Sequence, residues 1–316
     1  MISADIVKQW AEEAGFLACG ITDLGPNAYA DALDRWLAAG YGGTMRYIHR
    51  QARKRKNPAL ADQEARSAVV VLDSYYYDDG AQNATPPRVA KYARGKDYHD
   101  TMGRRLEALA ERLRQAGATH TRCYVDAGPI PERELARRAG LGWIGKNAML
   151  IRPGVGSFFF IGEILTDLEL ARDAPFETDH CGSCTRCIDA CPTGAIVEPR
   201  VVDATRCISY LTIEQKGPIP DDLSAKMDGW VFGCDICNDV CPWNVRFAER
   251  RDGREDGPGG QDGPGGRGGG VKRILASIEQ MTEEEFERHF AGTPFSRPGL
   301  SGMRRNMEAW VMGHES

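Results

Sequence analysis

Two runs of closely spaced cysteines constrain this 316-residue chain more than any other feature of its sequence. In each run, two or three other residues separate successive cysteines, and the run ends in Cys-Pro. Together the runs contain Cys181, Cys184, Cys187, Cys191, Cys234, Cys237 and Cys241. The spacing C-x2-C-x2-C-x3-C-P of the first run is the ligand pattern of bacterial four-iron clusters. Paired C-x2-C also suits tetrahedral zinc, but zinc does not explain this pattern twice. The runs therefore predict two 4Fe-4S clusters.

The ligands of each cluster follow from the ferredoxin pattern, in which the fourth cysteine of a run crosses to the other cluster. The second run lacks its first cysteine, since position 231 is Val, and Cys207 is the nearby candidate to replace it. Clusters that only stabilise the fold are the alternative, although one metal site would be enough to stabilise a domain of this size. We expect the first cluster on Cys181, Cys184, Cys187 and Cys241, and the second on Cys191, Cys207, Cys234 and Cys237.

The order of apolar patterns predicts an α/β or α+β fold with several parts. Residues 1–170 alternate between helical periodicity and strand-like apolar runs at 68–72, 123–125 and 158–165. Residues 171–250 are short, cysteine-rich and interrupted by Cys-Pro and Gly. Residues 251–270 contain DGPGG twice and are predicted to be a flexible linker, because such a segment buries too little surface to order itself. Residues 271–316 are predicted to be a short helical tail, in which Thr282 caps EEEFERHF.

The charge distribution and the N-terminal sequence predict a basic face and a cellular compartment. The formal net charge is -5, yet residues 44–160 hold 21 Lys and Arg against 12 Asp and Glu, so one face can be basic. The start, MISADIVKQWAEEAG, has the spacing of an amphipathic helix capped by Ser3 and lacks the features of a signal peptide. No run of eighteen apolar residues exists, so we expect no membrane span and a cytoplasmic protein. Ten cysteines in that reducing compartment favour metal ligands over disulfides.

A second redox group should lie in the larger domain, because iron-sulfur clusters only move electrons. No G-x-G-x-x-G follows a strand, which disfavours a Rossmann nicotinamide or flavin site. The string GLGWIGK follows a helical pattern and is predicted to be a helix C-terminal turn whose glycines let backbone approach a ligand. The string from Asp97 to Gly103 misses the Asp-x-His-x-x-Gly spacing of one cobalamin module by one residue. A corrin would have to bind without that motif.

Several long strings resemble the epoxyqueuosine reductases, which are cobalamin-dependent iron-sulfur enzymes of queuosine synthesis in transfer RNA. Besides the cysteine runs, the resemblance covers residues 1–250 and rests on KYARGKDYHD, VDAGPIPERELARRAGLGWIGKNAMLI, GSFFFIGEILTD and RCISYLTIEQKGPIP. It implies a nitroreductase-like cobalamin-binding domain in residues 1–170, followed by a ferredoxin-type two-cluster domain. It also implies that reduced clusters feed a corrin that converts the epoxide of the modified wobble guanosine into an alkene.

Asp126 is the expected proton donor, since removing an epoxide oxygen as water needs two electrons and two protons. It ends an apolar strand-like run and precedes Gly128-Pro129, and the family's proposed general acid occupies this position. An Asp buried beside a corrin face would have its pKa raised by desolvation. An Asp that hydrogen-bonds its own turn is the alternative.

The other expected cofactor contacts carry polar groups near these strings. Tyr98 and His99 would line the reactive face of the cofactor, or else belong to a partly exposed helix start. Lys146 and Asn147 would hydrogen-bond corrin propionamides or a phosphate, and Ser209 lies two residues after Cys207. The resemblance aligns Arg55 with a family arginine near the corrin.

The expected macromolecular partner is the anticodon stem-loop of a transfer RNA carrying epoxyqueuosine, which cationic side chains would hold by its phosphates. RYIHRQARKRK has six cationic residues among eleven, although such a run is also typical of a solvated face. The expected contacts are Arg50, Arg53, Lys54, Arg133 and Arg137. We also expect a monomer and an external electron donor of the flavodoxin or ferredoxin type. A corrinoid reductase of a small halogenated molecule and a ferredoxin-type electron carrier are the alternative functions.

Overall fold

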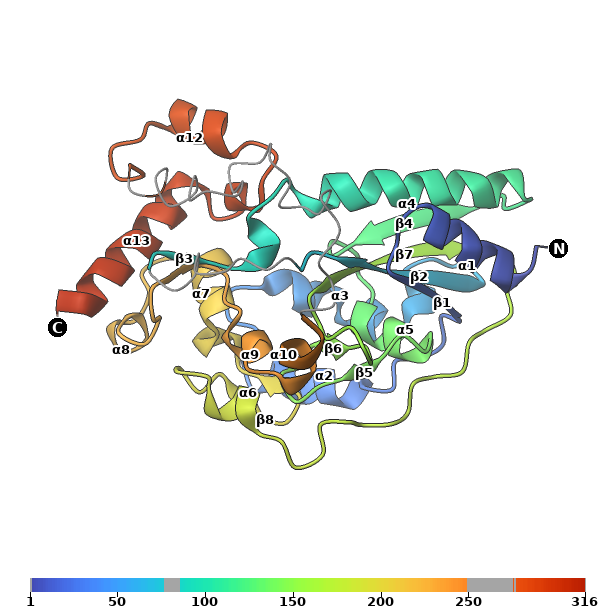
Figure 1. Ribbon diagram of the computed structural model, residues 1–316, viewed down its shortest axis with the longest axis horizontal. Helices are drawn as coiled ribbons and strands as arrows, with labels where there is room; N and C mark the ends of the chain where they lie inside the picture. Colours follow the sequence, from blue (N-terminus) through green and yellow to red (C-terminus); the bar gives the residue numbers. More distant parts are fainter. Residues whose placement is uncertain (1, 77–85, 249–274, 276, 316) are drawn as a thin grey trace. The chain divides into compact units, whose positions relative to one another are not determined.

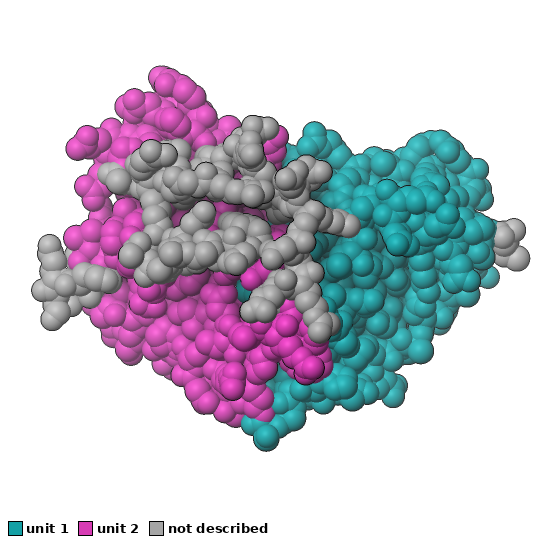
Figure 2. Space-filling model, in the orientation of Figure 1, with its two compact units in different colours: residues 1–40, 46–74, 99–183 teal, residues 41–45, 75–98, 184–316 magenta. Residues whose placement is uncertain are grey.

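The computed structural model describes residues 2–76, 86–248, 275 and 277–315. They form two compact units, coloured separately in Figure 2, and each unit draws on segments far apart in the sequence. Unit 1 consists of residues 1–40, 46–74 and 99–183, and unit 2 of residues 41–45, 75–98 and 184–316. The predicted linker, residues 251–270, lies outside the described residues, and the other predicted domain boundaries remain predictions.

A four-stranded sheet with the order β1-β2-β7-β4 is the framework of unit 1 (Figure 1). The strands are β1 (Ala18–Thr22), β2 (Ser67–Ser74), β4 (Thr121–Val125) and β7 (Phe159–Thr166). All three pairings are antiparallel, so this unit is α+β. The three apolar runs predicted to be strands lie in β2, β4 and β7 and are confirmed.

Helices cover both faces of this sheet, as Figure 1 shows for α1 (Ala4–Glu13) and α4 (Tyr98–Gln115) on one side and α5 (Glu132–Arg138) on the other. The predicted cap is confirmed, because the Ser3 side chain accepts the Ile6 N–H at the start of α1. Helix α4 approaches β7 closely at Gly162, where a Cβ atom would lie 2.6 Å from Met102 Cε. On the opposite face, a cluster that includes Val70, Leu135 and Leu165 forms a buried core.

The GLGWIGK string begins in the turn that ends α5. Gly140 has a φ of 74°, its N–H donates to Arg137 O, and the Leu141 N–H donates to Ala136 O. These two bonds form a Schellman motif, which confirms the predicted helix C-terminal turn. The space beside Gly142 is filled by the chain's own backbone, since a Cβ atom there would lie 2.2 Å from Ile151 O. The remaining elements of unit 1 are α2 (Ala30–Ala38), α3 (Arg46–Lys56), η1 (Pro58–Leu60), β5 (Trp143–Ile144) and β6 (Leu150–Ile151).

Unit 2 is made of short elements around a parallel pair of strands, β3 and β10. Its elements are β3 (Arg88–Val89), η3 (Lys91–Ala93), α6 (Arg186–Asp189), β8 (Ile196–Glu198), β9 (Val201–Val202), η4 (Ala204–Arg206), α7 (Ile208–Ile213), α8 (Asp221–Ser224), β10 (Trp230–Phe232), α9 (Ile236–Asp239), α10 (Pro242–Ala248), α12 (Glu283–Phe290), η6 (Pro294–Ser296) and α13 (Gly299–Glu315). Thr282 and Glu285 form a capping box on α12, which confirms the predicted cap.

The C-terminal helices belong to the core of unit 2. Phe290 and Met303 are fully buried in one cluster with Phe232 of β10. The Asn306 side chain is also fully buried and donates to Thr212 O at 2.8 Å and to Val231 O at 2.9 Å. Helix α13 is thus joined by hydrogen bonds to both α7 and β10. Within the described residues, no helix combines the length and apolar character that crossing a membrane requires.

Candidate active site and cluster ligands

Asp126 occupies a strained turn directly after β4. Its φ is 57°, in the left-handed region that is unfavourable for residues with a Cβ atom, and the Ala127 N–H donates across it to Val125 O at 2.6 Å. The side chain is 64% exposed, and its Oδ2 lies 3.9 Å from His99 Nε2 at the start of α4. The turn therefore presents a carboxyl group outward, beside a histidine that is 39% exposed. The burial expected for Asp126 is not observed.

Arg55 of α3 holds the segment that follows this turn. Its guanidinium donates to Gly128 O at 3.0 Å and to Ile130 O at 3.1 Å. Gly128 packs so tightly on the ring of Tyr124 that a Cβ atom there would lie 2.6 Å from it. Arg55 and Gly128 together fix the path of the backbone from β4 into α5. Arg55 was predicted as a cofactor contact, and the structure also gives it this supporting position.

Two glutamates that the sequence analysis missed lie near the turn: Glu163 is fully buried, and Glu132 is partly buried. Burial, together with the nearby Asp126 carboxylate, raises the pKa of Glu132 at the start of α5 to about 8. Glu163 of β7 is fully buried, and burial raises its pKa well above the ordinary value, with Glu132 and Asp126 adding to the effect. A glutamate in the middle of the apolar run FFFIGEIL was the available signal, because a carboxyl group in a buried strand is costly.

This arrangement suits proton transfer to a bound molecule. An exposed carboxyl group can reach a substrate, while the burial of Glu132 and Glu163 favours their protonated forms near neutral pH. His99 adds a second titratable group on the exposed side.

The structure gives the other predicted cofactor contacts partners in their own surroundings. Lys146 Nζ donates to Gly182 O at 2.7 Å, and Asn147 Oδ1 accepts the Met149 N–H at 3.2 Å. Tyr98 lies at the start of α4, where its ring centroid is 6.1 Å from that of Tyr92. Ser209 lies in the first turn of α7.

Seven of the eight predicted cluster ligands belong to unit 2, and Cys181 belongs to unit 1. Three of these thiols accept backbone N–H groups: Ala195 N–H donates to Cys191 Sγ at 3.3 Å, and backbone N–H groups also donate to Cys207 and Cys234. Such bonds stabilise thiolates and the negative charge of an iron-sulfur cluster. In unit 1, Trp143 Nε1 donates to Cys181 Sγ at 3.5 Å.

The members of the predicted second ligand set influence one another electrostatically. Burial raises the pKa of Cys237, and Cys207 and Cys191 are among the neighbours that raise it further. Cys234 is likewise affected by Cys237 and Cys207. Cys187 of the predicted first set also raises the pKa of Cys237, so these four sulfurs lie in one part of unit 2 together with Cys187. Within the described residues, no three His, Cys, Asp or Glu side chains meet in the geometry of a single metal ion.

The predicted RNA contacts differ in how accessible they are. Arg50, Arg53 and Lys54 of α3 are exposed, and Arg133 is exposed while donating to Ala148 O. The Arg137 side chain is only 18% exposed and lies 3.7 Å from Glu134.

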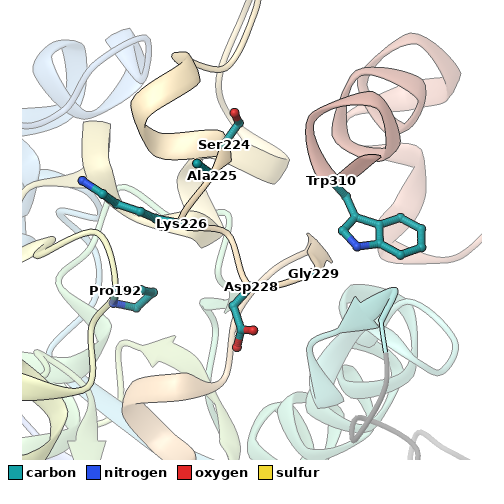
Figure 3. Close-up of a pocket in the computed structure, with 7 residues that line it drawn as sticks. All are labelled: Pro192, Ser224, Ala225, Lys226, Asp228, Gly229 and Trp310. Atoms are coloured by element: carbon teal, nitrogen blue, oxygen red, sulfur yellow. The ribbon is translucent and has the colours of Figure 1, made fainter. Parts of the chain in front are cut away.

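A separate hollow of about 410 Å³ lies in unit 2 (Figure 3). Figure 3 shows that side chains from several segments surround it: Pro192, Ser224, Ala225, Lys226, Asp228, Gly229 and Trp310. None of these is a predicted site residue, and Asp228 pairs with Arg88.

Comparison with known proteins gives matches in both halves of the chain. Residues 55–127 match the family model described as epoxyqueuosine reductase QueG, DUF1730, and residues 180–244 match a 4Fe-4S double cluster binding domain. The chain is 40% identical over 307 residues to the epoxyqueuosine reductase of Cyclobacterium marinum, which spans 96% of this chain and 94% of that protein.

Solved structures agree with this match. A crystal structure of epoxyqueuosine reductase with an epoxyqueuosine-modified tRNA-Tyr stem loop has a TM-score of 0.79 and 30% identity, covering 97% of this chain and 80% of that one. A Bacillus subtilis epoxyqueuosine reductase, in which the loop of the catalytic aspartate is swung out of the active site, has a TM-score of 0.77 and 29% identity, covering 97% and 80% of the two chains. With near full-length identity of about 40% and the same fold, this chain belongs to the epoxyqueuosine reductase family.

Proposed function

We propose that this chain reduces epoxyqueuosine to queuosine at the wobble position of transfer RNA. The observation that carries the proposal is the 40% identity to an epoxyqueuosine reductase over 96% of the chain. The related structure with a modified stem loop supports the anticodon stem-loop as substrate. The seven cysteines of the two runs, together with Cys207, would hold two 4Fe-4S clusters, which an external flavodoxin- or ferredoxin-type protein would reduce.

Cobalamin is the proposed second cofactor, in a nitroreductase-like domain formed by the first 170 residues. The described residues fit a polar ligand there, because the side chains of Asp126 and His99 are 64% and 39% exposed on unit 1. Cobalamin supplies a low-valent cobalt centre that delivers electrons to the substrate. The proposed contacts are Arg55, Tyr98, His99, Asp126, Lys146, Asn147 and Ser209.

Asp126 is the proposed proton donor. Its outward-facing carboxyl group would donate to the epoxide oxygen as a C–O bond breaks, and His99 would help to orient it. Arg55 would keep the turn in the donating position through its bonds to Gly128 and Ile130.

Phosphates of the stem-loop are proposed to lie against α3, where exposed Arg50, Arg53 and Lys54 follow one another. Arg133 is a further proposed contact, and so is Arg137, which would first have to leave Glu134. We also propose that the protein works in the cytoplasm as a monomer.

The test is conversion of an epoxyqueuosine-containing stem-loop by anaerobically reconstituted protein, with epoxyqueuosine and queuosine measured by mass spectrometry. Asp126→Asn should lower the rate at least about 100-fold, because general acid catalysis contributes that much or more. Asp5→Asn, an exposed residue in the first turn of α1, is the matched control and should keep the wild-type rate. An absence of conversion by fully loaded wild-type protein would refute the function, and unchanged turnover in Asp126→Asn would refute the role of Asp126.

A further inference from the structure

Three carboxyl groups come together where β7, the end of β4 and the start of α5 meet in unit 1. Glu163 of β7 pairs with Tyr124 of β4, and Tyr124 lies two residues before Asp126 in the chain. Its side chain shares the face of β7 that carries Ile161 and Leu165, in the core that α5 covers. Glu132 is the first residue of α5. Asp126 and Glu132 both act electrostatically on Glu163, so the three acids form one group.

Buried oxygen atoms without partners distinguish this group from an ordinary acidic cluster. Among the described residues, neither carboxyl oxygen of the fully buried Glu163 has a hydrogen-bond partner, nor does the buried Oε1 of Glu132. Buried carboxylates normally have ion-pair or hydrogen-bond partners, because leaving them charged and unpaired is very costly. A protonated, neutral carboxyl group is the form that such surroundings favour.

The proposed reaction needs more protons than Asp126 can hold. Converting an epoxide to an alkene breaks both C–O bonds, consumes two electrons and two protons, and releases the oxygen as water. The electrons come from the cluster-fed reductant, whereas a single carboxyl group donates one proton at a time. A second proton held next to Asp126 would complete the reaction without waiting for solvent.

We propose, on the basis of that function, that Glu132 and Glu163 form a proton store that reloads Asp126 within one turnover. Asp126 gives its proton to the substrate oxygen and becomes a carboxylate. Glu132 then passes a proton to Asp126, directly or through one ordered water, and Asp126 donates again. Glu163 passes its own proton to Glu132, so the three acids lose two protons in all. Between turnovers the two protons return from solvent through Asp126, whose side chain is 64% exposed.

The charged groups around Glu132 determine the pH at which it loses its proton. Asp126, from the β4–α5 turn, opposes ionisation of Glu132, and Glu132 in turn opposes ionisation of Glu163 from β7. Arg133 of α5 and Arg55 of α3 favour it. Glu132 is less buried than Glu163 and has a pKa of about 8, so it should lose its proton before Glu163 as the pH rises.

Infrared spectroscopy of the holoenzyme tests whether the store exists, without any turnover. Wild-type protein at neutral pH should show the C=O stretching band of protonated carboxylic acid, which the isosteric Glu163→Gln and Glu132→Gln variants should each reduce. Glu111→Gln, which removes an exposed carboxylate of α4 that pairs with Arg114, is the matched control and should leave the band unchanged. No such band in the wild type, or the same band in both variants, would overturn the proposal.

Single-turnover kinetics on the epoxyqueuosine stem-loop test whether the store is used. Both Gln variants should react at least about 10-fold more slowly, while the concentration at which the single-turnover rate is half-maximal should stay unchanged. The wild-type rate should fall as pH rises through about 8, and Glu132→Gln should lack this fall. Wild-type rates and pH profiles in both variants would overturn the proposal. If wild-type protein failed to convert epoxyqueuosine, the proposed function would be wrong, while the carboxyl band would still show whether the pair holds a proton.

Discussion

The stability of the Glu163→Gln variant should increasingly exceed that of the wild type as the pH rises. Gln is isosteric with a protonated glutamic acid, so the two proteins should have similar stability near pH 5, where Glu163 is neutral in the folded state. The folded-state pKa of Glu163 lies well above the unfolded value of 4.5, because the side chain is fully buried. Above the unfolded value, unfolding therefore releases a proton from wild-type Glu163.

The magnitude follows from proton linkage. When the folded state holds one more proton than the unfolded state, the free energy of unfolding falls by about 1.4 kcal/mol for each pH unit. This loss begins above the unfolded pKa and continues until the pH reaches the folded pKa. At each pH between these two pKa values, the wild type should therefore lose about 1.4 kcal/mol per pH unit relative to Glu163→Gln. For a unit of this size, each pH unit then corresponds to a difference in Tm of about 3–6 °C.

Thermal unfolding of the two holoproteins, measured side by side under anaerobic conditions at several pH values, provides the assay. Only the difference in Tm matters, because other titrating groups contribute equally to both proteins. Glu111→Gln should follow the wild type, since that residue is exposed and ion-paired. A difference in Tm that stays constant from pH 5 to pH 7.5 would show that Glu163 is not protonated in the folded state, and the reasoning about the buried pair would fail with it.

Three other changes test packing and pairing elsewhere in the two units. Asn306→Ala should cost about 2–3 kcal/mol, because it removes two buried hydrogen bonds to α7 and β10 and leaves their carbonyls unpaired; chemical denaturation measures the loss. Gly142→Ala should lower Tm and reduce soluble yield, because the new Cβ atom would meet Ile151 O at 2.2 Å, and overpacking of this kind costs about 1–3 kcal/mol. His120→Gln should cost less than about 1 kcal/mol and should cost more at pH 6 than at pH 8. The pairing with Asp62 raises the folded-state pKa of His120 above 6.5, so its stabilisation is complete below that value and disappears as the pH rises through the folded pKa; Tm measured at the two pH values checks the sign.

Local patterns predicted most of the elements that frame the site. Apolar runs predicted β2 and β7, because strands buried on both faces have few polar residues, and the run at 123–125 predicted the part of β4 that ends in buried Tyr124 and Val125. The caps at Ser3 and Thr282 and the turn at Gly140 were also predictable, since each depends on a few neighbouring residues.

Contacts between distant segments explain what the sequence did not reveal. Strand β3 pairs with β10 some 140 residues later, so residues 75–98 join unit 2 although the chain around them belongs to unit 1. The acid group behind Asp126 depends on the register between β4 and β7 and on where α5 begins, and no local motif encodes either. A charged residue inside an apolar run was visible, but its partners were not.

The Asp126 turn combines two requirements that oppose each other. A left-handed φ at a residue with a side chain costs about 1–3 kcal/mol, and the side chain is open to solvent, so the turn alone would readily relax. The two bonds from the Arg55 guanidinium to Gly128 and Ile130, each worth about 1.5–3 kcal/mol, are large enough to offset that cost. A related enzyme has been solved with its aspartate loop swung out. In this chain the Arg55 bonds keep the Asp126 turn in place, as the proposed proton transfer from Glu132 requires.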